Sequence, residues 1–222
     1  QAYATYEDLM ALTEEMLGEI VKSLFGKLQI EYQGEIIDFT PPWRRISLLD
    51  SLVSLGGFDL ECLMDAVAMQ NYLKSHSIPT TGKEAPGKLQ VEIFEAVVEP
   101  KLIQPTFVID YPVEVSPLSR RKDEDSSNAE RFELFIAGRE IANAFSELND
   151  PIDQRQRFLK QLEERGPDDD LPARIDEDFL RALEYGMPPV SGFGVSERLF
   201  AFLADKPVRE AVLFPLLKPE NR

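Results

Sequence analysis

Glu133 is the first residue whose surroundings in the sequence suggest chemistry. It lies within the apolar run Arg131–Ile136, in which Phe132, Leu134 and Ile136 share one face of a predicted strand and Glu133 occupies the other. A carboxylate in such a strand costs free energy unless a cation or a hydrogen-bond donor satisfies it. We therefore expect a partner for Glu133, and a solvent-facing glutamate on a half-exposed sheet is the alternative.

A second candidate set follows in the segment 140–150. Asn143, Phe145 and Glu147 are spaced by two residues, so a strand would place all three on one face. An amide, an aromatic ring and an acid form a wall that suits a zwitterionic ligand with a cationic group, because the acid neutralises an ammonium and the amide orients the polar end. The alternative is the polar outer face of an edge strand.

A third set is the glycine-rich run Gly192-Phe193-Gly194, followed by Arg198. Glycines allow the backbone to approach a ligand closely, and a guanidinium can stack on a flat base or pair with phosphate. The run lacks the spacing of a dinucleotide-binding fingerprint, and no phosphate-loop lysine accompanies it. The pairs Arg44-Arg45 and Arg120-Arg121 could also meet phosphate, although surface charge is the alternative for both.

The composition excludes several classes of site. The chain of 222 residues carries 24 Lys+Arg and 40 Asp+Glu, a formal net charge of −16, which argues against wrapping nucleic acid over the whole surface. One cysteine, Cys62, excludes an intramolecular disulfide, and one histidine, His76, excludes a multi-histidine metal site. No apolar run approaches the roughly 20 residues of a membrane helix, so we expect a cytoplasmic protein whose chemistry uses carboxylates, arginines and backbone.

Periodicity and turn residues predict an α+β fold, an antiparallel sheet flanked by helices. Thr5 and Gly26 fit the two caps of the first helix, and the polar segment 117–128 and the acidic segment 167–172 are predicted loops, the former mobile. The expected helices cover 6–25, 46–52, 60–67, 89–97, 151–165, 176–185 and 196–204, and the expected strands cover 28–32, 36–39, 106–110, 131–136, 140–148, 192–195 and 211–214.

Together these segments resemble the C-terminal part of the catalytic domain of a bacterial-type class II lysyl-tRNA synthetase. The resemblance runs in order along the whole chain, 1–222. It is carried by Tyr6–Met10, Asp38–Ile46, Glu99–Thr106, Asp110–Leu118, Arg131–Asp150, Gly186–Pro189 and Leu213–Pro215.

The resemblance implies an enzyme that condenses lysine with ATP and passes the lysine to tRNA(Lys), with Mg²⁺ on the ATP phosphates. Glu133 and Glu140 match magnesium- and ATP-associated glutamates, and Asn143, Phe145 and Glu147 match lysine-pocket positions. Gly192 and Gly194 belong to the same pocket, and Arg198 matches the arginine of the third class II motif, which acts at the nucleotide. Because Glu140 has the opposite strand parity to Asn143 and Glu147, we expect a bulge or the hairpin turn to re-aim it.

The resemblance also sets limits. The first two class II motifs and the anticodon-binding domain have no counterpart in this sequence, so we expect this piece alone to be inactive and the complete protein to be a homodimer. The glycine motif is one residue shorter than usual, with Val195-Ser196 where a third glycine would stand. Two other functions stay open, namely a paralogue that lysylates a translation elongation factor and a non-catalytic interaction module that kept the fold.

Overall fold

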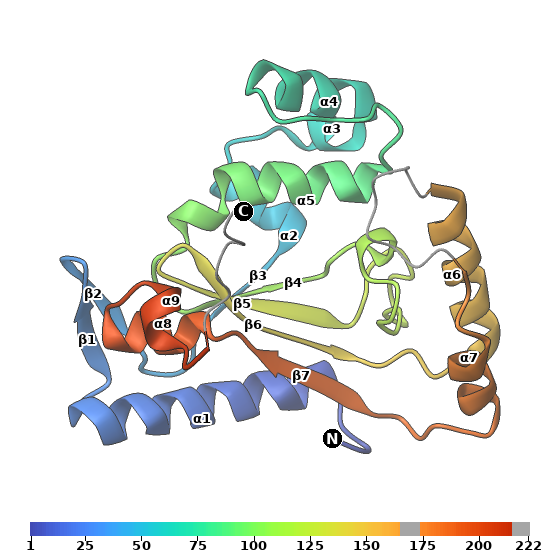
Figure 1. Ribbon diagram of the computed structural model, residues 1–222. Coiled ribbons are helices and arrows are strands. Elements are labelled where there is room, and N and C mark those ends of the chain that lie inside the picture. The colour runs from blue at the N-terminus through green and yellow to red at the C-terminus, as the bar shows by residue number, and fades with distance from the viewer. Residues whose placement is uncertain (165–173, 215–222) are drawn as a thin grey trace, which may run out of the picture.

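A five-stranded sheet forms the centre of the computed structural model, which describes residues 1–164 and 174–214 (Figure 1). The strand order is β3-β4-β5-β6-β7, and every neighbouring pair is antiparallel except β3 with β4. The mixture of this sheet with helices on both faces confirms the predicted α+β class. The strands are β3 (Arg44–Ser47), β4 (Thr106–Ile109), β5 (Arg131–Ile136), β6 (Arg139–Ser146) and β7 (Ser191–Val195).

Helix α1 (Tyr6–Phe25) covers one face of the sheet, together with the hairpin of β1 (Gln29–Tyr32) and β2 (Glu35–Asp38) and the helix α8 (Arg198–Ala204). The backbone N–H of Thr5 donates to Asp8 at the start of α1, and Gly26 ends the helix in the left-handed region at φ 71°. The buried core on this side includes Leu17, Phe132 and Leu134.

A second helical layer covers part of the opposite face. Its helices are α2 (Leu48–Ser54), α3 (Leu60–Met64), α4 (Ala66–Ser75) and α5 (Pro86–Val97), followed by the 3₁₀ turns η1 (Glu99–Lys101) and η2 (Val113–Val115). Val108 and Phe135 of the sheet pack against Leu89, Ile93 and Phe94 in this layer. Val108 and Phe135 belong to β4 and β5, so this layer packs on that part of the face.

Two helices, α6 (Pro151–Glu164) and α7 (Glu177–Glu184), stand beside the end of the sheet at which β6 finishes (Figure 1). Arg155 of α6 forms two hydrogen bonds to the Glu177 carboxylate at the start of α7. Within the described parts of the chain, no helix is long and apolar enough to cross a membrane.

The predicted irregularity near Glu140 is present. The β5–β6 register shifts between Leu134 and Phe135, which pair with Ala142 and Glu140 respectively, so Ile141 is the extra residue of a bulge. Because of this extra residue, even-numbered residues before the bulge and odd-numbered residues after it lie on the same face of β6. It places Glu140 opposite Phe135 while Asn143 stays opposite Glu133.

Two predictions about elements are wrong. Residues 44–47, which we expected partly in a helix, form the edge strand β3, because pairing with β4 overrides local pattern. The strand predicted over 211–214 is absent: Pro207 precedes the short helix α9 (Val208–Ala211), and Leu213 and Phe214 are over nine-tenths exposed. The predicted loop 167–172 lies outside the described residues.

The segment 117–128 contains no helix or strand, which confirms the predicted loop, and its mobility stays a prediction. Its backbone pairs with neighbouring segments at the bridges Ser119–Glu147 and Arg121–Ala129. Ion pairs from Arg120 to Asp123 and from Lys122 to Asp110 hold it further. The charged run therefore forms ion pairs within the loop and with Asp110 beside it.

Candidate functional site

The sheet register brings the predicted site residues together on one face. One row across β5, β6 and β7 consists of Glu133, Asn143 and Gly194, and the next consists of Arg131, Phe145 and Gly192. Residues between these rows, such as Phe132, Ala144 and Phe193, pack into the core beneath α1. The strand alternation predicted for Glu133 and for the Asn143–Glu147 set is therefore confirmed.

Glu147 is a partly buried carboxylate that pairs with no cationic or donor side chain among residues 1–164 and 174–214, and the positive charge that acts on it is the amino group of Gln1. Burial raises the pKa of its carboxyl above the usual value. A carboxylate held in this way gains most from a ligand that brings a positive charge to it.

Gly192 provides the space that the Glu147 carboxylate occupies. A Cβ built on Gly192 would lie 2.3 Å from Glu147 Oε1, whereas a Cβ on Gly194 would meet nothing closer than the Asn143 carbonyl at 3.9 Å. Neither glycine has a positive φ, so the reason for glycine at position 192 is close approach and not backbone conformation.

Glu133 is fully engaged, which overturns the alternative of a solvent-facing glutamate. Its carboxylate pairs with Arg131, accepts a 2.7 Å hydrogen bond from the Tyr111 hydroxyl and lies 3.4 Å from the Asn143 amide nitrogen. Arg131 Nε also donates to Asn143 Oδ1 at 3.3 Å, and its guanidinium lies 4.8 Å from the centre of the Tyr111 ring. This network links Glu133, predicted to bind Mg²⁺ and ATP, to Asn143, predicted to line the lysine pocket.

Glu140 lies at the other end of the site, 4.0 Å from the guanidinium of Arg198 at the start of α8. Burial, and then the negative charge of Glu133, raise the pKa of Glu140, while Arg198 acts in the opposite direction. Burial and neighbouring acids also raise the pKa values of Glu95 and Glu99. This corner therefore carries an excess of negative charge.

That excess suits a divalent cation, although the donor set is small. Within the described residues, no group of three or more His, Cys, Asp or Glu side chains is placed to hold a metal. Mg²⁺ commonly takes only one or two protein carboxylates and completes its shell with water and phosphate oxygens. The Glu133 and Glu140 carboxylates therefore fit Mg²⁺ only when a phosphate ligand accompanies it.

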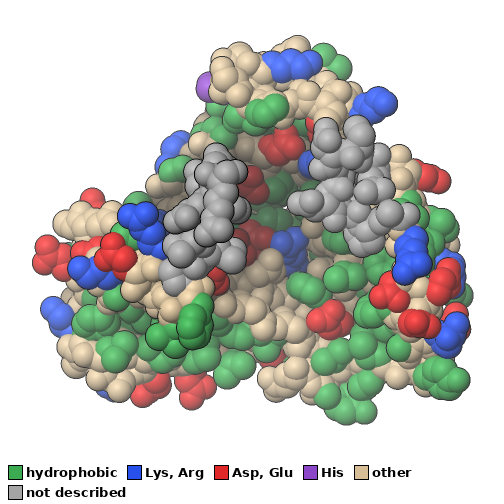
Figure 2. Space-filling model, viewed as in Figure 1, with side chains coloured by type: hydrophobic (Ala, Val, Ile, Leu, Met, Phe, Trp, Pro, Cys, Tyr) green, Lys and Arg blue, Asp and Glu red, His purple; other side chains and the backbone are tan. Residues whose placement is uncertain are grey.

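A cavity of about 360 Å³ lies between Glu140, Asn143, Gly194 and Arg198. A larger cavity of about 590 Å³ opens between α2, α5 and α6 and is lined by Arg121 but by none of the residues that the resemblance assigns to the site. Two of the charged residues that line the larger cavity form ion pairs, Asp110 with Lys122 and Arg121 with Asp153. We therefore assign the chemistry to the smaller cavity and the adjoining face. Figure 2 shows the molecule hollowed near its centre, with acidic side chains in the hollow.

The sequence analysis missed Arg131 and Tyr111. Arg131 has the same strand parity as Glu133, so its place on this face was available from the pattern, whereas Tyr111 follows β4 and gave no signal. The phosphate hypothesis for Arg120 and Arg121 is not supported, because both side chains pair with acids. Arg44 and Arg45 are exposed on the edge strand β3, which fits surface charge.

The family model described as tRNA synthetases class II (D, K and N) matches residues 1–218. This chain belongs to that family.

Curated relatives of this class II synthetase chain are lysine–tRNA ligases. The protein of that name from Pelotomaculum thermopropionicum is 50% identical over 225 residues, covering all of this chain and 44% of the relative. Those from Campylobacter jejuni strain RM1221 and Carboxydothermus hydrogenoformans are 48% and 47% identical, with 98% and 100% of this chain and 44% and 46% of the relative covered. The chain thus spans less than half the length of these relatives.

The electrostatics of the synthetase site predict two opposite shifts at Glu140. Glu133→Gln removes a negative charge and should lower the pKa of Glu140, whereas Arg198→Met removes a positive charge and should raise it further. Carboxyl ¹³C chemical shifts followed through a pH titration measure both effects. Shifts of the same sign in the two variants, or none in either, would show that the three groups do not share a site.

Proposed function

We propose that the protein containing this chain activates lysine with ATP to lysyl-adenylate and transfers the lysine to tRNA(Lys). The observation that carries the proposal is the partly buried Glu147 carboxylate, which no described side chain pairs, lying over Gly192 and on one face with Asn143 and Phe145. The lysine–tRNA ligase names of the relatives support the same substrate.

The amino-acid end of the site uses charge and shape. In this proposal the Glu147 carboxylate accepts hydrogen bonds from the side-chain ammonium of lysine, which supplies the charge that no described side chain provides. Phe145 lies in the same row as Gly192. Its ring therefore lies beside the surface that Gly192 leaves open, where the aliphatic part of lysine would pack. Asn143, held by Arg131, orients the polar end of the amino acid.

The nucleotide end uses Glu133, Glu140 and Arg198. Arg198 begins α8 beside Glu140, where its guanidinium can stack on the adenine or pair with phosphate. In this proposal Glu133 and Glu140 hold Mg²⁺ that accompanies ATP, and the ion supplies charge neutralisation to the phosphate oxygens. Despite the shortened glycine motif, Gly192 and Gly194 face the site and Arg198 lies at its edge.

Adenylate formation demands positioning more than reactive side chains. The lysine carboxylate is itself the nucleophile toward the α-phosphorus, and pyrophosphate leaves, so no nucleophilic residue of the protein is needed. This agrees with a site built from carboxylates, an amide, arginine and glycine.

The proposal includes a cytoplasmic homodimer, as the resemblance implies for the complete protein.

Lysine-dependent exchange of pyrophosphate into ATP by the full-length protein tests the proposal. We expect exchange with lysine and Mg²⁺, and esterification of tRNA(Lys) in a second assay. Absence of exchange would favour a non-catalytic interaction module. Exchange with lysylation of an elongation factor in place of tRNA would favour the paralogue.

Glu147→Gln tests the amino-acid end separately. Truncating one partner of a buried charge pair costs about 2–5 kcal/mol, so the lysine KM should rise by roughly 30- to several-thousand-fold while the ATP KM changes little. Glu31→Gln is the matched control, because Glu31 is a strand glutamate that faces solvent; its effect should stay within about 0.5 kcal/mol. Equal small shifts in both KM values for Glu147→Gln would remove Glu147 from the lysine site.

A further inference from the structure

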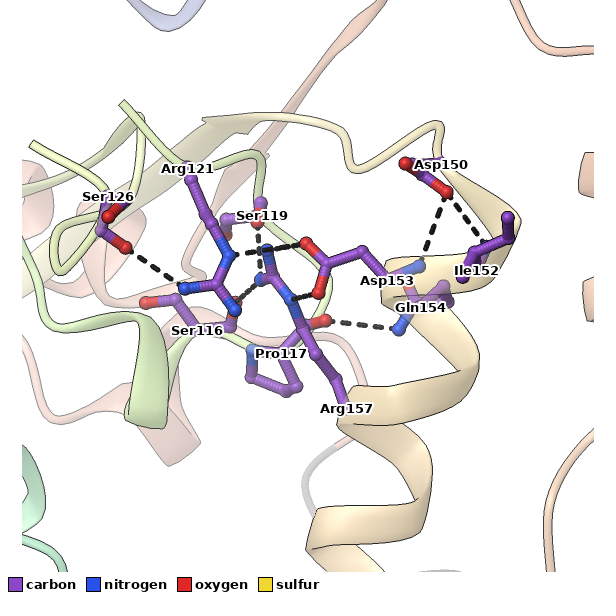
Figure 3. Close-up of polar contacts among 10 residues, drawn as sticks. All are labelled: Ser116, Pro117, Ser119, Arg121, Ser126, Asp150, Ile152, Asp153, Gln154 and Arg157. Atoms are coloured by element: carbon purple, nitrogen blue, oxygen red, sulfur yellow. Dashed lines mark hydrogen bonds and ion pairs between the residues drawn. The ribbon is translucent and has the colours of Figure 1, made fainter. Parts of the chain in front are cut away.

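Arg157 of α6 is a buried arginine outside the site described above. Its side chain is only 7% exposed, and its Nε and Nη2 bind the Asp153 carboxylate at 3.1 and 2.8 Å (Figure 3). Asp153 also accepts a 3.3 Å hydrogen bond from Arg121, and hydrogen bonding from Arg157 is the main cause that lowers the pKa of Asp153. A buried ion pair of this kind is weak evidence for stability alone, which leaves its purpose to be explained.

The remaining contacts of Arg157 point to the segment 116–119. Its Nη1 donates to the carbonyls of Ser116 and Ser119, at 3.2 and 2.7 Å, and Gln154, also buried on α6, donates to the Pro117 carbonyl at 3.1 Å. Figure 3 shows these groups of α6 directed at the same short stretch of chain. Helix α6 thus binds three carbonyls of a segment that has no regular strand or helix of its own.

That segment sets the backbone position of Glu147. Ser119 bridges to Glu147 in an antiparallel pairing, in which Arg120 N donates to Ser146 O at 2.7 Å and Leu148 N donates to Leu118 O at 2.8 Å. On its other side the Glu147 N–H donates to Val190 O at 2.9 Å. The carboxylate of Glu147 therefore projects from a backbone held between the segment 116–119 and residue 190.

The same segment reaches Asn143 through Arg131. Arg131 Nη1 donates to the Val115 carbonyl and to Ser116 Oγ, both at 3.0 Å, while its Nε binds Asn143. Ser116 is contacted by both arginines, since Arg157 binds its carbonyl and Arg131 binds its hydroxyl. A displacement of this segment would therefore move both Glu147 and Asn143.

We propose that Arg157, oriented by Asp153, is a positioning residue for the amino-acid end of the site, acting through the segment 116–119 on Glu147 and Asn143. The inference rests on the proposed lysine activation. Its specific consequence is a separation of effects: loss of Arg157 should impair recognition of lysine while the nucleotide end, which depends on Glu140 and Arg198, is little changed.

The test uses the full-length protein with the variants Arg157→Ala, Arg157→Lys and Arg155→Ala. Arg155 is the matched control, because it lies on the same helix but is 41% exposed and pairs with Glu177 away from the segment. Arg157→Ala should raise the lysine KM in pyrophosphate exchange by about tenfold or more, since small misplacements of binding groups have large effects, and should change the ATP KM by less than about twofold. Arg155→Ala should change neither KM.

Arg157→Lys keeps the charge but cannot reach two carbonyls and a carboxylate together, so it should fall between the wild type and Arg157→Ala. This variant decides the question if Arg157→Ala does not fold. Equal changes in both KM values, or a lowered Tm with an unchanged lysine KM, would overturn the positioning role. Absence of lysine-dependent exchange in the wild type is a different result, because it would overturn the proposed function first.

Discussion

Uncompensated charge on a partly buried sheet face is the constraint on which this structure depends. Glu133 and Glu147 both project from that face, but Glu133 is compensated by Arg131 and Tyr111, whereas no described side chain pairs with Glu147. A carboxylate that stays ionised and desolvated raises the free energy of the folded protein. The contrast therefore distinguishes the Glu133 carboxylate, which is paired within the protein, from the Glu147 carboxylate, which has no side-chain partner.

The surrounding fold keeps that arrangement in place. The bulge at Ile141 lets Glu140 and Asn143 serve the same site despite their opposite parity in the sequence. Gly192 leaves room for the Glu147 carboxylate, and the neighbouring backbone is fixed by the segment 116–119. Each of these features is local, and together they set the positions of the polar side-chain atoms of Glu140, Asn143 and Glu147 on the face formed by β5, β6 and β7.

Much of this was predictable from the sequence because it follows from strand parity. Alternation in 131–136 and 143–147 predicted the shared face, and the mismatch at Glu140 predicted the bulge. The edge strand β3 was not predictable in this way, because Arg44 and Arg45 give no strand pattern and the pairing with β4 lies about sixty residues away in the chain. The contacts of Arg157 with Ser116 and Ser119 are equally non-local. The sequence predicts that Arg157 lies on a helix, but it does not predict which groups its side chain contacts.

The most direct measurement compares lysine binding to Gly192→Ala and Gly194→Ala in the full-length protein by calorimetry. A methyl group at position 192 would lie 2.3 Å from Glu147 Oε1 and must displace the carboxylate, while one at position 194 meets only a carbonyl at 3.9 Å. The account predicts that Gly192→Ala weakens lysine binding by about tenfold or more and that Gly194→Ala changes it by less than about threefold. Equal affinities in the two variants and the wild type would contradict the claim that lysine is recognised by the carboxylate over Gly192.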